Sequence, residues 1–214
     1  KIEMGVLRNI QLGLERYYDL VPFMDVEDCR LQRVGDVGHD RECLMVRTRG
    51  DYVELGLFVD PELEERAAEF HELGGPGLDA WAALVEGVSH FLYVGHCGAF
   101  DRRVSLNELE YQAEIDKFLF TAASFAHDSE ELSGQLVVLY RQLFFGWSYV
   151  DAGDDRLDLY RDANRRAQAL CARWLEDVKK RQWRLADLQR EGRRFYRKNF
   201  EGKSRAPVAK SLAP

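Results

Sequence analysis

The stretch VSLNELEYQAEIDKFLF, residues 104–120, predicts a long helix that sets the fold class of the whole chain. Ser105, followed three residues later by Glu108, forms a capping box and marks where the helix begins. Counting 100° per residue from this start places one set of residues on a narrow stripe, which we expect to face solvent: Asn107, Glu110, Glu114, Lys117, Thr121 and Ser124. The most conspicuous acids of the stretch are therefore explained as a helix cap and a solvent-facing surface.

The same angular count places Asp116 on the opposite, apolar arc of the helix, so we expect its carboxylate to be buried. A buried carboxylate without a partner costs several kcal/mol or raises its pKa until it is neutral. Gln112 shares that arc, and Asn164 lies inside an apolar seam with 3–4 spacing in a later helix. We therefore predict that Gln112, Asp116 and Asn164 form a structural polar core that fixes the register of the helices.

A catalytic site in the same interior is the alternative interpretation, with Asp116, His90 and Glu86 as its candidate residues. Glu86 and His90 are four residues apart and share one helix face. Helical bundles that hold carboxylate–histidine metal centres use a Glu-x-x-His spacing, and that spacing does not occur in this sequence. The sequence therefore predicts no metal and no cofactor, and it leans away from an enzyme.

Periodicity along the rest of the chain predicts a mainly helical protein. Helical spacing covers residues 2–20, and Asp60-Pro61 begins a second helix as its N-cap and first position. Two alternating apolar runs separated by Arg-Gly-Asp predict a β-hairpin at about residues 42–59. The further helices are expected at about 78–97, 105–126, 129–150 and 156–190. We predict a bundle of about five to six helices with a small N-terminal hairpin; an α+β domain with a third strand from residues 29–37 is the alternative.

Composition places the chain among ordinary soluble globular proteins, with 46% hydrophobic and 31% charged residues over 214 positions. The longest apolar stretch, residues 136–150, is interrupted by Arg141 and Gln142 and falls short of the roughly 20 residues that a membrane span needs. The four cysteines lie far apart without a Cys-x-x-Cys pair. Reduced thiols in a cytoplasmic protein are the simplest interpretation.

Charge is distributed unevenly along the chain. From residue 179 onward there are twelve Lys or Arg and three acids, which gives a net charge of +9. Since the net charge of the whole chain is −7, residues 1–178 carry a net charge of −16. An acidic body followed by a basic segment indicates an interaction surface. The organisation we expect is a single domain over residues 1–190 with the hairpin attached, followed by a basic C-terminal extension over residues 191–214.

Aromatic rings are interleaved with the cations of this segment, which is a pattern suited to binding. The predicted contact residues are Lys179, Lys180, Arg181, Trp183, Arg193, Arg194, Phe195, Tyr196, Arg197 and Lys198. We expect a non-enzymatic interaction or adaptor module that contacts an acidic protein partner. Nucleic-acid association through the same segment is the first alternative, although an overall acidic protein repels phosphates. An enzyme with a site in the bundle core is the second alternative. The sequence does not determine the oligomeric state.

Overall fold

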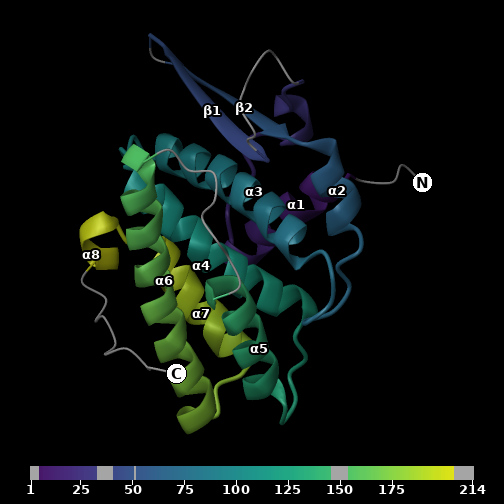
Figure 1. The fold of residues 1–214 in the computed structure, drawn as a ribbon. Helices are drawn as coiled ribbons and strands as arrows, with labels where there is room; N and C mark the ends of the chain where they lie inside the picture. Colours follow the sequence, from purple (N-terminus) through teal and green to yellow (C-terminus); the bar gives the residue numbers. More distant parts are fainter. Residues whose placement is uncertain (1–4, 33–40, 51, 146–153, 205–214) are drawn as a thin grey trace. The chain divides into compact units, whose positions relative to one another are not determined.

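The computed structural model describes residues 5–32, 41–50, 52–145 and 154–204, and over these ranges the chain is mainly helical (Figure 1). Eight α-helices and one two-stranded antiparallel sheet are present in the described residues, and most of these residues are helical. The elements in order are α1 (Val6–Tyr18), the 3₁₀ turn η1 (Glu27–Cys29), β1 (Glu42–Arg49), β2 (Tyr52–Val59), α2 (Pro61–Ala67), α3 (Leu78–Ala99), α4 (Leu106–Phe125), α5 (Leu132–Phe145), α6 (Asp154–Arg181), α7 (Leu185–Tyr196) and α8 (Phe200–Ser204). The predicted fold class, a helical bundle with a small N-terminal hairpin, is confirmed.

The described elements divide into two compact units, which are described separately below. Unit 1 comprises residues 1–71 and 75–104, and unit 2 comprises residues 72–74 and 105–214. The domain boundary expected at residue 190 falls inside α7, so the predicted C-terminal extension contributes helical turns to unit 2.

In unit 1 the hairpin, α1 and α2 all pack against α3. Asp60 caps α2 as predicted, because its side chain accepts a hydrogen bond from the backbone N–H of Glu62 at 3.0 Å. Leu57 of β2 is completely buried and lies against α3 at Gly87, where an added Cβ would come within 3.3 Å of the leucine side chain. The alternative third strand is limited to an isolated parallel bridge between Arg30 and Leu57, and residues 33–40 lie outside the described part of the chain.

In unit 2, α4 is enclosed by three other helices, α5, α6 and α7. Its start is as predicted, since the Ser105 hydroxyl accepts the backbone N–H of Glu108 at 3.2 Å. The predicted solvent stripe is wrong: Glu110 is 5% exposed, Lys117 is 8% exposed and Thr121 is completely buried. A helix with only one packed face would leave this stripe in solvent, whereas α4 has neighbours on several sides.

The expected long helix over residues 156–190 is interrupted. α6 ends at Arg181, Gln182 adopts a left-handed conformation with φ 53°, and α7 begins only at Leu185. The helix expected at 129–150 is observed as α5 over Leu132–Phe145, and the remainder of that prediction lies outside the described residues. No helix in the described ranges has both the length and the apolar character that crossing a membrane requires.

Candidate functional site: the basic corner of unit 2

Four cations and one tryptophan lie at the break between α6 and α7, where the backbone turns. We call this group the basic corner: Lys179, Lys180, Arg181, Trp183 and Arg184. The turn is held by two carboxylates. Asp187 accepts the backbone N–H of Arg184 at 2.9 Å, and Asp128 accepts the N–H of Leu185 at 3.4 Å. Asp128 thereby connects the start of α7 to the loop before α5, and this anchors the corner.

Most cations of the corner and of α7 form exposed ion pairs with acids on their own helix. Lys180 lies 2.5 Å from Glu176, and Arg181 lies 3.1 Å from Asp177. The hydrogen bond and charge of Lys180 lower the pKa of the Glu176 carboxyl. Exposed pairs of this kind contribute only about 0–1 kcal/mol each, so acids of a partner can compete for the same cations.

Two predicted contact residues, Lys179 and Lys198, are exposed and make no ion pair within the part of the chain that the structure describes. Lys179 borders a hollow of about 480 Å³ between the start of α5 and the end of α6. The residues that line the hollow are Ser129, Glu130, Leu132, Ser133, Val178, Lys179, Gln182, Trp183 and Arg184. Lys179 therefore adds a positive charge to a concave surface that the acid Glu130 also lines.

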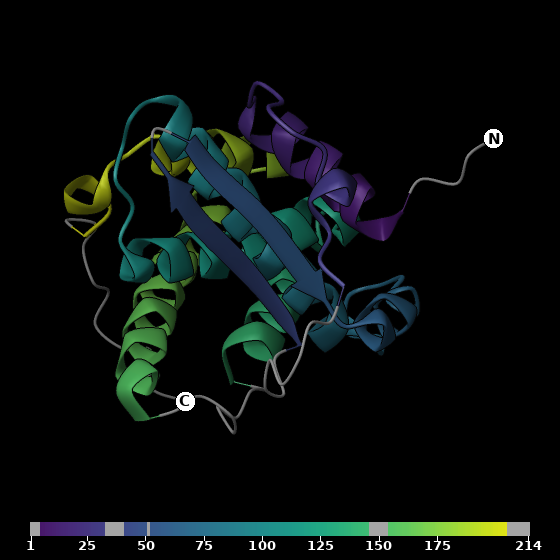
Figure 2. The ribbon, with the colours of Figure 1, turned by 90° about the horizontal axis from the view of Figure 1, so that it is seen from above.

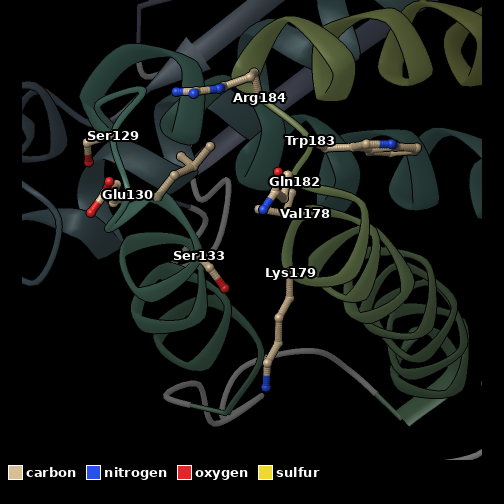
Figure 3. A pocket seen from close by; sticks show the side chains of 9 residues that line it. Ser129, Glu130, Ser133, Val178, Lys179, Gln182, Trp183 and Arg184 are labelled. Carbon is tan, nitrogen blue, oxygen red and sulfur yellow. The ribbon is translucent and has the colours of Figure 1, made fainter.

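Figure 3 shows how these side chains are directed. Ser133, Lys179 and Gln182 point into the space between the two helices, and Arg184 reaches across one end of it toward Ser129. Trp183 points the other way. An ammonium group, a hydroxyl and a carboxamide around one hollow can bind a carboxylate or another small anion.

Two of the predicted contact residues are not available at the surface. Phe195 and Tyr196 are 3% and 2% exposed, and the Phe195 ring packs edge-on against Tyr111 at 5.2 Å and Trp174 at 6.3 Å between centroids. The prediction that these rings contact a partner is corrected: they hold α7 in the core of unit 2. They were placed on the contact surface because their cationic neighbours suggested an exposed segment. Of the aromatic residues proposed for contact, Trp183 stays half-exposed.

The predicted polar core exists in part. Asp116 is 1% exposed, and its Oδ1 accepts a hydrogen bond of 2.6 Å from Nε2 of Gln112. Gln112 Oε1 in turn accepts a 2.6 Å bond from the ammonium of Lys203, which is completely buried in α8. Asn164 does not extend this chain of bonds, because its amide donates to Glu114 at 3.4 Å.

Lys203 is the residue that sequence reasoning missed. Its Nζ lies 3.9 Å from the buried Glu108 carboxylate and 4.9 Å from the centre of the Phe195 ring. A lysine in a basic segment is ordinarily solvated, and nothing in the local sequence pairs it with Gln112, 91 positions earlier. Within this cluster the polar groups form hydrogen bonds with residues of the same chain, which is typical of a structural network.

The catalytic candidates are divided between the units. Glu86 and His90 lie one helical turn apart on α3 in unit 1, and His90 is 9% exposed. Asp116 lies on α4 in unit 2. The three residues therefore form no common site within either unit.

Comparisons with known proteins give no independent indication of function. No protein-family model, curated protein or solved structure matches this chain.

Proposed function

We propose that this chain is a non-enzymatic interaction module that binds an acidic protein partner through the basic corner of unit 2. The observation that carries the proposal is the position of Lys179, an exposed cation without an ion pair in the described part of the chain, at the edge of a hollow that also presents Ser133 and Gln182. Carboxylates of a partner would meet an ammonium group and two neutral hydrogen-bonding groups at that point. The surrounding cations would steer the approach of an acidic surface.

A protein partner is favoured over single-stranded nucleic acid by the state of the aromatic rings. Binding of single strands uses exposed rings on which bases stack, and burial removes Phe195 and Tyr196 from that role. The −16 charge of the remainder of the chain would also repel a phosphate backbone. We place the interaction in a reducing cytoplasm, which is consistent with four cysteines that form no disulfide within the described residues.

The test compares two anionic probes by fluorescence anisotropy in about 0.15 M salt: a labelled 20-residue peptide rich in Glu, Asp and Leu, and a labelled 20-nucleotide single strand. The full chain is compared with Lys179→Glu/Arg184→Glu. The matched control is Arg161→Glu/Arg165→Glu, which reverses two charges on the same helix far from the corner along the chain. Circular dichroism verifies that each variant is folded.

We expect the corner variant to bind the acidic peptide about tenfold more weakly, and the control variant to bind it nearly unchanged. Equal losses in both variants would reduce the effect to net charge and refute a site at the corner. Tighter binding of the oligonucleotide than of the peptide, lost in the corner variant, would replace the protein partner with nucleic acid.

A further inference from the structure

The hairpin of unit 1 has an edge that no described residue covers. β1 and β2 pair continuously from Glu42↔Val59 to Arg49↔Tyr52, and only two residues separate the two strands in the sequence. With this spacing Arg49↔Tyr52 is a hydrogen-bonded pair, and the bonding pairs then alternate along the ladder. The N–H and C=O groups of Leu44, Val46 and Thr48 therefore point away from β2.

The other strand confirms this alternation. By the same count the backbone carbonyl of Leu57 in β2 points outward, and it accepts the N–H of Leu31 at 2.9 Å from outside the hairpin. β1 has no such partner in the described ranges, because its sheet contains only β1 and β2. The outer side of β1 is thus a row of backbone donors and acceptors available to another strand.

Apolar side chains are exposed on both faces of the outer half of the hairpin. Met45 and Val46 of β1 are 55% and 51% exposed, and Tyr52 and Val53 of β2 are 78% and 53% exposed. The inner half is covered, since Leu57 is completely buried. Figure 1 shows the hairpin rising away from α3 toward its turn, and Figure 2 shows the two strands side by side along their length. An apolar surface that continues outward from a buried one is typical of an interaction site.

Charge and alternation specify what the edge would accept. Along β1 one face carries Met45, Arg47 and Arg49, and the other carries Leu44 and Val46. Glu54 of β2 lies opposite Arg47 and 3.5 Å from Arg49 in an exposed ion pair, so the row keeps one net positive charge. A strand added beside β1 would place its alternate side chains next to these two rows. Acidic residues suit the row with the arginines, and apolar residues suit the other.

We propose that β1 binds an extended segment of a partner protein in which acidic and apolar residues alternate, and that the segment adds a third strand to the hairpin. Main-chain hydrogen bonds would supply affinity, and the two rows of side chains would supply specificity. A second copy of this chain is a less suitable occupant, because β1 has no acid between residues 43 and 49 to place beside Arg47 and Arg49. This inference lies in unit 1 and does not depend on the basic corner of unit 2.

The test uses three capped, labelled eight-residue peptides: alternating Val-Glu, alternating Val-Lys, and the Val-Glu peptide N-methylated at every second residue. The N-methylated peptide keeps the charge and removes one row of backbone donors, so it controls for attraction to any basic surface. Binding is measured by anisotropy with the full chain, with Arg47→Glu/Arg49→Glu, with Val46→Pro, and with Lys179→Glu/Arg184→Glu. Val46→Pro removes an outward N–H without removing a bond between β1 and β2.

We expect the full chain to prefer Val-Glu over both other peptides by at least about tenfold. The Arg47→Glu/Arg49→Glu variant should reverse the order of Val-Glu and Val-Lys, Val46→Pro should abolish binding, and the corner variant should bind like the full chain. Equal binding of the N-methylated peptide, or an unchanged order in the arginine variant, would overturn the proposal. If Val46→Pro fails to fold, the reversal in the arginine variant decides alone.

Discussion

Replacing Lys203 with methionine tests how the end of unit 2 is held in place. Methionine keeps most of the side-chain length, but it removes the charge and the hydrogen bond of 2.6 Å to Gln112. The completely buried ammonium also lies 3.9 Å from Glu108 and 4.9 Å from the centre of the Phe195 ring. The variant would leave the Gln112 carbonyl oxygen and the Glu108 carboxylate without this partner in a dry environment.

Removing one partner of a buried ion pair costs about 3–5 kcal/mol, mostly because the remaining charge is uncompensated. For a chain of this size each kcal/mol lowers Tm by about 2–4 °C, so we expect a decrease of roughly 6–20 °C. The free energy of unfolding would be measured by urea denaturation, followed by circular dichroism and by fluorescence, since Trp174 packs on Phe195.

Lys198→Met is the matched control, because Lys198 is exposed and makes no ion pair within the described ranges. We expect its effect to stay within about 0.5 kcal/mol. Adding Glu108→Gln to Lys203→Met should recover part of the loss by removing the uncompensated charge. A Lys203→Met protein as stable as the control would refute the reasoning. The free-energy cost of removing the lysine from water would then equal the favourable free energy of its contacts with Gln112, Glu108 and Phe195.

Three further predictions concern other parts of the chain. Truncation after residue 184 should unfold unit 2, because Phe195 would be lost from its packing on Tyr111 and Trp174; a truncated chain with an unchanged circular-dichroism spectrum would contradict this. Ellman's reagent should modify Cys43 rapidly and the other three thiols slowly, because they are buried and burial raises the pKa of Cys171 well above its usual value; Cys43→Ser should remove the fast phase. Burial alone would raise the pKa of Asp79, but the hydrogen bonds and charges of Arg66 and Arg41 lower it overall. The stability it contributes is therefore present above its unfolded pKa of about 4 and is lost as pH falls through the lower folded value. Asp79→Asn should flatten this acid dependence of the unfolding midpoint, and an equally steep profile in the variant would exclude the pairing as its source.

Local sequence patterns predicted the helices and strands of this fold more successfully than they predicted which side chains neighbouring helices bury. The cap at Ser105 and the β-hairpin at about residues 42–59 depend on residues close in sequence, and both are found in the structure. The burial of Asp116 was predictable because its angular position falls among apolar residues of one helix. The angular method failed for Glu110 and Lys117 because it describes a helix with one packed face, and α4 is enclosed by several helices.

Other features depend on contacts between distant residues, for which one sequence carries no signal. The break after α6 contains neither Gly nor Pro, and the left-handed residue there is Gln182. It is held by Asp128, 57 positions before Leu185. The partners of Lys203, Gln112 and Glu108, are likewise distant from it in the sequence. The sequence could predict the basic corner as a charged segment. It could not predict the hollow, because Ser133 of α5 lies far from the corner in the sequence and only folding brings the two together.

The position of Lys203 has a consequence for how the protein is made. Unit 1 closes within the first 104 residues of the sequence, so it can fold as soon as that length has left the ribosome. Helix α4 is synthesised immediately afterwards, but its buried Gln112 and Glu108 meet their lysine only after a further 91 and 95 residues, respectively. At about 5–20 residues per second, α4 waits roughly 5–20 s for this lysine. During that interval unit 2 is the part of the nascent chain that depends on protection from aggregation.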